Sequence, residues 1–551
     1  LQNTGNRPQS EILVNLPQGF LNTIQLERAQ LLADLPELCA QVYRIDPPLL
    51  PGEKLTLKST CSYEAPALEF ELKFPTLVQN GLTLFGVRPT IGYDKHRELT
   101  DEKDRQVRGL TKRQLSSALD TQKSNGRQKH SGATDSDLLK VETIVSTDSD
   151  QVAIAPGALL DTWSQHNRRY FHYRLDDPTR AFVPIVLSAR LKVASAMYEN
   201  IATEVWYHPD HEWNVPNFMH GLHSALSYCT SNFGPYQYKF ARVVEFPRYK
   251  GKLAAMAFPG TMPYSESAGF TADTRLAGAF DTVFFVVAHE VAHQWWAYQV
   301  VAADMEGEDL LQESLAEYTA VMVMEREFGP EMVRRWLSVA RHSYLIGRAD
   351  EATIEHPLSK VRHDQKYVAY YKGCIVMYYL KQLIGEQKIN SALRKLLLKF
   401  KDKGPPYAVS TDLIDALRTE TPPQYHPLLD DLFNRIILFS NKINLASMER
   451  FADGRRRITL EVECQKLEIN EKGVEQTVPF EQPIEIGVFS APLNGQQYGD
   501  SLHQQMHTLK SGRNTIVLET TGTPDTVVVD PFFLLIDRNT ANNVATLTTE
   551  P

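Results

Sequence analysis

The sequence has few of the features that mark membrane-spanning or exported chains. None of its apolar runs approaches the roughly 18 residues that a helix needs to cross a bilayer. Its first residues, LQNTGNRPQSEILV, lack both the basic start and the apolar core of a signal peptide. Because the chain begins with Leu1 rather than methionine, we expect a fragment or a processed form whose targeting segments lie outside it.

Cysteine is scarce, and its placement excludes one kind of metal site. The chain holds five cysteines and no C-x-x-C pair: Cys39, Cys61, Cys229, Cys374 and Cys464. A structural zinc site built from thiolates is therefore not expected. Cys39 and Cys61 can pair in an oxidising compartment, but buried free thiols are the more frequent arrangement. The cysteines thus leave the redox compartment open.

Positive charge is also too sparse for a nucleic-acid-binding surface. The 58 Lys and Arg residues are outnumbered by 67 Asp and Glu, which gives a formal net charge of −9 and a pI near 6.0. No basic stripe interrupts this balance, so we expect no nucleic-acid partner. A chain of 551 residues without internal repeats predicts three or four domains.

The chain up to about residue 195 has the pattern of β structure. Residues 68–74, LEFELKF, alternate apolar and charged side chains, which is typical of a half-buried strand. Between about 98 and 138 this pattern gives way to charged and small residues, which predicts a long surface loop. We therefore predict an N-terminal β domain over 1–195 that carries this polar loop.

From about residue 196 the apolar residues recur with the period of an α-helix, and after about residue 448 apolar and polar residues alternate again as in β-strands. Helices are predicted over 331–345, 371–384, 387–400 and 426–439. The alternating stretches beyond residue 448 predict a small all-β module, a β-sandwich. The predicted fold class is therefore α+β and multidomain, with a central domain over 196–447 and a C-terminal β-sandwich over 448–551.

The stretch FFVVAHEVAHQWW contains the pattern H-E-x-x-H. His289 and His293 are four residues apart, so on a helix both imidazoles face the same side and can bind one metal ion. Glu290 lies beside that face, where its carboxylate can take a proton from a water at the metal. The flanking phenylalanines, valines and tryptophans predict that this helix is buried. A buried helix with purely structural histidines is the alternative.

A catalytic zinc takes three protein ligands and one water, so a further ligand is needed. The next helical stretch, LLQESLAEY, provides Glu313 and Glu317 one turn apart. Glu313 is the best candidate for the third ligand. Glu317 is either a second acceptor that orients a histidine or a surface acid.

HEVAHQWW followed by LLQESLAEY resembles the gluzincin zinc aminopeptidases, the family of membrane alanyl aminopeptidase and leukotriene hydrolase. The family pattern is H-E-x-x-H, eighteen residues, and a glutamate within N-E-G-F-A-E-Y. Here nineteen residues separate His293 from Glu313, and Gln312 occupies the strict spacing. A neutral amide is a poor zinc ligand, so the match favours Glu313. The resemblance implies a thermolysin-like catalytic domain over 196–447, one Zn²⁺ per chain and a peptide substrate with a free N-terminus.

Two more residues take roles from this resemblance. Glu266, 23 residues before His289, stands where the family has the glutamate of a G-x-M-E-N strand that binds the substrate's amino group. Its flanking residues differ from that motif. Tyr370 stands at the first position of the family's Y-x-K-G segment, whose tyrosine donates a hydrogen bond to the oxyanion, and Tyr371 is the alternative. The residues of the first domain that share the substrate amine in the family have no match here.

Two alternatives to an aminopeptidase remain. The first is a gluzincin of other specificity, either an endopeptidase or an epoxide hydrolase. The second is an inactive peptidase fold that serves as an accessory module of a membrane assembly. The phrases MPYSESAGF, HEVAHQWW and DPFFLLIDRNTANNV also resemble bacterial peptidase domains fused behind transporter-like permeases. That likeness implies a soluble domain tethered to a bacterial membrane through segments that precede residue 1. The oligomeric state has no signal in the sequence.

Overall fold

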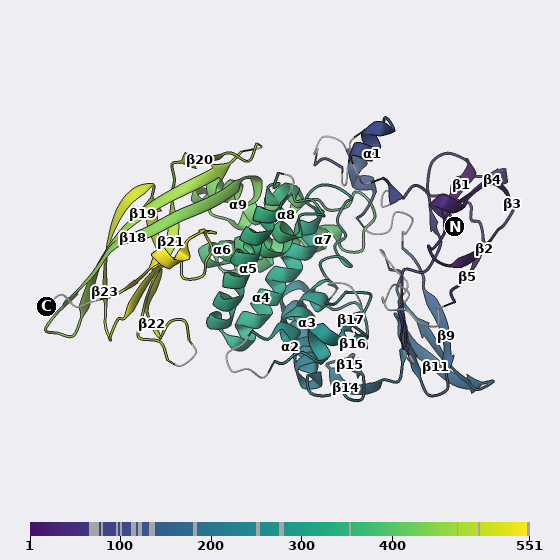
Figure 1. The fold of residues 1–551 in the computed structure, drawn as a ribbon, viewed down its shortest axis with the longest axis horizontal. Helices are drawn as coiled ribbons and strands as arrows, with labels where there is room; N and C mark the ends of the chain where they lie inside the picture. Colours follow the sequence, from purple (N-terminus) through teal and green to yellow (C-terminus); the bar gives the residue numbers. More distant parts are fainter. Residues whose placement is uncertain are drawn as a thin grey trace. The chain divides into compact units, whose positions relative to one another are not determined.

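The computed structural model describes residues 1–64, 76–78, 81–94, 97–99, 102–111, 117–119, 124–131, 138–179, 185–248, 254–274, 280–351, 354–470, 472–493 and 496–547. These residues form two compact units (Figure 1). The first unit comprises Leu1–Ser117, Gln128–Met219 and Gln237–Ala272. The second unit comprises Ala118–Arg127, His220–Tyr236 and Asp273–Pro551.

The first unit begins with small antiparallel sheets. One sheet has the order β3 (Ala29–Leu35), β4 (Ala40–Leu49), β1 (Gln9–Asn15) and β8 (Thr90–Ile91). β2 (Leu21–Leu26) pairs with β5 (Leu57–Ser62). Side chains of these strands and of the residues next to them form one apolar core: Val14, Leu16, Leu26, Tyr43, Ile45, Leu49 and Leu55. This arrangement is the β structure that the alternating sequence predicted.

Two further sheets follow in the first unit. One has the order β10 (Val152–Ile154), β13 (Ile185–Ala189), β7 (Gly81–Phe85) and β6 (Thr76–Val78). The other has the order β11 (Ala158–Gln165), β12 (Arg168–Arg174) and β9 (Glu142–Asp148). The strand predicted over 68–74 lies outside the described residues. The described part of the predicted polar loop includes α1 (Glu102–Val107) and the short turn Ser124–Gln128.

A four-stranded mixed sheet completes the first unit. Its order is β14 (Lys192–Tyr198), β15 (Ile201–Tyr207), β16 (Phe240–Phe246) and β17 (Thr261–Ser265). β15, β16 and β17 run parallel, and β14 is antiparallel. Every residue of β16 and β17 is buried, as is typical of parallel strands that are covered on both faces. The π-helical turn Glu266–Phe270 directly follows β17.

The second unit contains the helices of the site (Figure 1). They are α3 (Thr282–Ala292), α4 (Leu315–Phe328), α5 (Pro330–Asp350), α6 (Gly373–Ile384), α7 (Glu386–Phe400), α8 (Ser410–Glu420) and α9 (His426–Asn434). Two single π-helical turns, η5 (Leu310–Ser314) and η7 (Val368–Lys372), lead directly into α4 and α6. α4 packs beside α3, and the Trp296 indole donates a hydrogen bond to Thr319 Oγ1 across that interface at 3.0 Å.

Two antiparallel sheets close the second unit. β18 (Ile436–Arg450), β19 (Arg456–Ile469), β20 (Glu475–Val478) and β23 (Gly512–Thr520) form the first of them. The second has the order β22 (Ser501–Lys510), β21 (Glu481–Phe489), β24 (Thr526–Val529) and β25 (Val544–Thr546). The predicted helix over 426–439 is wrong in its last part, because Ile436–Phe439 pair with β19.

The predicted fold class is confirmed: β-rich N-terminal sheets, a helical region with the H-E-x-x-H helix and C-terminal β-sheets. The domain boundaries near residues 195 and 447 stay predictions. All five cysteines are free thiols. Among the described residues, no helix has the length and apolar character needed to cross a membrane.

Candidate metal centre

The buried helix α3 and its C-cap residue hold the two histidines of the H-E-x-x-H pattern. It starts at an N-cap, where Asp281 accepts a hydrogen bond from the Phe284 backbone N–H at 3.0 Å. Its side chains are almost all apolar and buried, which fixes the rotation of the helix in the core. His289 lies in the last turn of α3, and His293 is the first residue after the helix. Because the two are four residues apart, their rings lie on the same side, with centroids 4.6 Å apart.

A third donor comes from the turn η5. Glu313 Oε2 is 3.4 Å from His289 Nε2 and 3.4 Å from His293 Nε2, and the two nitrogens are 3.0 Å apart. Three donor atoms about 2.1 Å from one tetrahedral zinc ion would lie roughly 3.4 Å from one another. Glu313 Oε2 is buried and has no hydrogen-bond partner among the described residues. These three residues therefore fit a zinc ion.

An oxygen atom lies close to the other ring nitrogen of each histidine. His289 Nδ1 lies 2.8 Å from Glu317 Oε2 in an ion-pair contact, and His293 Nδ1 forms a 3.1 Å hydrogen bond with the Trp296 carbonyl oxygen. An oxygen beside Nδ1 stabilises a proton on that nitrogen and leaves Nε2 free to bind a metal. The structure thus places Glu317 against His289 rather than at the surface.

Charges within the site offset the effect of burial on the pKa values. Burial alone would lower the pKa of His289, but Glu313, Glu317 and Glu290 outweigh it and raise that pKa well above its ordinary value. Burial alone would raise the pKa of Glu313, and the two imidazoles hold it well below its ordinary value. Glu313 is therefore a carboxylate, which is the form that binds a cation.

Glu290 has the environment of a general base. It is buried on α3 beside the two histidines. Burial raises its pKa, and the nearby imidazoles limit that rise. A carboxylate with a raised pKa accepts a proton more readily than an exposed one.

Tyr370 lies in η7 and faces the site. Its ring stacks on the His289 ring with centroids 5.7 Å apart and planes 13° apart. Burial and the Glu313 carboxylate raise the pKa of Tyr370, so its hydroxyl keeps the proton and can donate it in a hydrogen bond. The alternative, Tyr371, has its ring 6.5 Å from Trp336 instead. The structure therefore brings Tyr370, and not Tyr371, against the histidine pair.

Glu266 belongs to the first unit, and its contacts lie within that unit. It begins the π-helical turn after β17 and is half-buried. Its Oε2 accepts a hydrogen bond from the Arg248 backbone N–H at 3.0 Å, which orients the carboxylate. Glu245, at the end of the neighbouring strand β16, is buried and accepts a hydrogen bond from the His208 backbone N–H at 2.6 Å. A second acid thus lies near Glu266, and no sequence pattern had indicated it.

A buried ionic network supports η7 on its other side. Lys372 Nζ lies 3.1 Å from Glu355 Oε1, and both side chains are 3% exposed. The Tyr344 hydroxyl donates to Glu355 at 2.7 Å, and Arg348 also pairs with this carboxylate. The sequence carries no signal for Glu355, because it lies 17 positions from Lys372 and shares no pattern with it.

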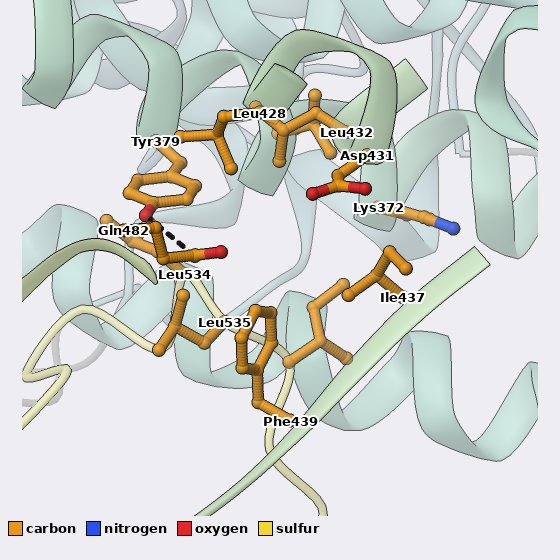
Figure 2. Close-up of a pocket in the computed structure, with 12 residues that line it drawn as sticks. Lys372, Tyr379, Leu428, Asp431, Leu432, Ile437, Phe439, Gln482, Leu534 and Leu535 are labelled. Atoms are coloured by element: carbon orange, nitrogen blue, oxygen red, sulfur yellow. Dashed lines mark hydrogen bonds between the residues drawn. The ribbon is translucent and has the colours of Figure 1, made fainter. Parts of the chain in front are cut away.

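The other side of Lys372 borders a small cavity. Figure 2 shows apolar side chains around it, with Tyr379 and Gln482 joined by a hydrogen bond of 3.2 Å at one end. Its volume is about 30 Å³, which is room for one or two water molecules. This cavity is too small for a peptide, so we do not assign the substrate to it.

One part of the sequence matches a known protein family: residues 219–433 match the peptidase family M1 domain. No curated protein matches the chain in sequence.

Two solved structures share the fold. One is Legionella pneumophila aminopeptidase A in complex with aspartic acid, 13% identical with a TM-score of 0.56. The match covers 98% of this chain and 56% of that one, so this chain spans about half the length of the Legionella enzyme. The other is a mutant of the M1 zinc metallopeptidase from Deinococcus radiodurans, 15% identical with a TM-score of 0.52. That match covers 77% of this chain and 86% of the other.

Proposed function

We propose that this protein is a zinc-dependent aminopeptidase. The observation that carries the proposal is the buried triangle of His289 Nε2, His293 Nε2 and Glu313 Oε2, with edges of 3.0 to 3.4 Å. One zinc ion per chain fits this triangle and leaves a fourth position open. The family M1 domain over 219–433 supports the same assignment.

The chemistry that zinc supplies when bound there is polarisation of the peptide carbonyl and a lowered water pKa, near roughly 7. Glu290 takes the proton of the attacking water and returns it to the leaving amine. The Tyr370 hydroxyl donates a hydrogen bond to the oxyanion that forms on the carbonyl. One such donor is worth about 3–4 kcal/mol at the transition state.

Glu266 makes the enzyme an exopeptidase in this proposal. The α-ammonium of a peptide is largely protonated at neutral pH, and a carboxylate binds it through a short charge-assisted hydrogen bond. The Arg248 N–H that orients the Glu266 carboxylate supports this role. As the likeness to permease-linked domains implies, we further propose that segments outside this chain tether the enzyme to a bacterial membrane.

The first test replaces the general base. Glu290→Gln should retain zinc, because Glu290 is not a ligand, and should lower kcat for an aminoacyl-anilide by about 10²–10⁴-fold. Glu449→Gln, at an exposed acid on β18, is the matched control and should change neither property. Zinc content and hydrolysis are measured on the same samples. Full activity of Glu290→Gln would refute the assignment of the base.

The same assay separates the alternative functions. N-acetylation of the anilide should abolish hydrolysis by the wild-type protein, because the blocked substrate has no ammonium for Glu266. Equal cleavage of blocked and free substrates would indicate an endopeptidase. A zinc-loaded protein that cleaves neither substrate would indicate an epoxide hydrolase or an accessory module.

A further inference from the structure

We propose that Ser314 is a positioning residue that fixes the turn carrying Tyr370 against the turn carrying Glu313. The inference rests on the proposed function, since it concerns the donor to the oxyanion. Ser314 is the last residue of η5 and is fully buried. Its Oγ donates a hydrogen bond of 2.6 Å to the Ala369 carbonyl oxygen in η7. Glu313 directly precedes Ser314, and Tyr370 directly follows Ala369, so one bond links the backbones of both site residues.

Gly373 makes this close approach possible. A Cβ built on Gly373 would lie 2.2 Å from Ser314 Oγ and 2.5 Å from Ser314 Cβ. No heavy atom fits at such distances, so a glycine is needed where η7 passes into α6. The hydroxyl of Ser314 occupies the space that this glycine leaves. The two turns therefore pack closely because the Ser314 side chain fits against Gly373, which has no side chain.

Both turns are π-helical, and single π-helical turns are rare and frequently lie at functional sites. Their backbone hydrogen bonds differ from those of the adjoining α-helices, so each turn needs contacts that hold it in place. On the side of Lys372, the ionic network with Glu355 supplies them. On the side of Ala369, Ser314 supplies the hydrogen bond.

The consequence concerns the transition state more than substrate binding. The Tyr370 hydroxyl must lie within hydrogen-bond distance of the oxyanion, and an error near 1 Å can cost about 10²-fold in rate. Ser314→Ala removes the hydroxyl but keeps Cβ. It should lower kcat by about 10-fold and leave KM and zinc affinity within about 3-fold, because the three ligands and Glu266 are unchanged.

A matched control exists elsewhere in the second unit. Ser410 is also fully buried, donates a hydrogen bond of 2.6 Å to a carbonyl oxygen, that of Ser359, and packs against a glycine, Gly307. The residues that it bonds to and packs against, Ser359 and Gly307, are neither Tyr370 nor residues of the metal triangle. Ser410→Ala therefore reports what the loss of such a bond does by itself.

The experiment is a double-mutant cycle with Tyr370→Phe. If Ser314 acts through Tyr370, Ser314→Ala should lower kcat about 10-fold in the wild type and no more than about 2-fold in Tyr370→Phe. Amide hydrogen exchange in the zinc-free protein gives a second readout. Peptides that contain residues 368–373 should exchange about 10-fold faster in Ser314→Ala than in Ser410→Ala.

Each outcome decides the proposal. An equal loss of kcat in both backgrounds, or the same loss in Ser410→Ala, would overturn it. Unchanged exchange of residues 368–373 would overturn it as well. If the wild-type protein binds zinc but hydrolyses no peptide, the proposed function fails, and the exchange arm alone still decides whether Ser314 holds the Tyr370 turn.

Discussion

At the scale of single residues, the metal centre shows how one carboxylate can differ from its neighbour. Glu313 and Glu317 are one turn apart, yet the imidazoles hold the pKa of Glu313 below its ordinary value, whereas burial raises that of Glu317. The difference follows from contact, because Glu313 Oε2 lies close to two ring nitrogens and Glu317 Oε2 lies close to one, His289 Nδ1. The number of imidazoles beside each carboxylate thus decides whether they outweigh the effect of burial on its pKa.

Asp530 is another buried acid, and it should make the stability of the protein depend on pH. Burial raises its pKa from 3.8 to about 7, against the hydrogen bonds that Leu534 and Leu535 donate. Because the folded protein binds this proton more tightly, the stabilisation is complete below pH 4 and is lost as pH rises through 7. The loss is on the order of 4 kcal/mol in the free energy of unfolding.

Asp530→Asn tests this dependence by urea unfolding between pH 5 and 9. Asparagine tolerates the φ of +57° at this position. Its amide has a single oxygen, however, so it accepts only one of the two backbone hydrogen bonds. The variant should therefore lack the decline in stability with rising pH that the wild type shows, and should be the more stable of the two above pH 8. Parallel curves for the two proteins would contradict the assignment.

At the scale of elements, the turn η7 depends on a buried ion pair. Removal of one partner of such a pair leaves an uncompensated charge, which typically costs about 3–5 kcal/mol. Glu355→Gln should therefore lower the free energy of unfolding by that amount, since Lys372 would lose its carboxylate. Urea unfolding at pH 7 measures the change.

The control for this prediction is the double variant Glu355→Gln/Lys372→Met, in which no charge remains at the pair. It should recover part of the lost stability, because the 3% exposed Lys372 no longer carries an unpaired charge, whereas Arg348, 17% exposed, still lacks its carboxylate. A single variant that loses less than about 1 kcal/mol would show that Lys372 does not depend on Glu355.

At the scale of the whole molecule, the metal triangle lies within the second unit, which the chain enters three times. Its donors come from α3 and η5, so an ion bound there joins separate elements of that unit. A ligand that binds only the folded state at 1,000 times its Kd stabilises it by about 4 kcal/mol. Zinc should therefore raise the Tm of the protein.

Removal of zinc with a chelator, followed by calorimetry, tests this effect. The Tm should fall by several degrees and return when zinc is added back. Glu313→Ala should make the Tm insensitive to zinc, whereas Gln312→Ala should keep the full response, because the neighbouring Glu313 remains. A wild-type Tm that is the same with and without zinc would count against the metal site, and a lost response in Gln312→Ala would move the ligand to position 312.

The sequence by itself determined what depends on spacing within one element. The helical period places His289 and His293 on one face of α3, and alternation predicts the strands, because both follow from local backbone geometry. The fold class could therefore be predicted and is confirmed. The roles of the six site residues stay predictions: His289, Glu290, His293, Glu313, Tyr370 and Glu266.

Contacts between elements were decided only by the tertiary structure. Sequence spacing gave two candidates for each role: Glu313 or Gln312 as the ligand, and Tyr370 or Tyr371 as the hydrogen-bond donor. In the structure, Glu313 and Tyr370 lie beside the histidines. The links from Ser314 to Ala369 and from Lys372 to Glu355 join residues 55 and 17 positions apart. No periodicity extends from one element to another. The packing of the helices, and not the local geometry of any one of them, therefore sets these contacts.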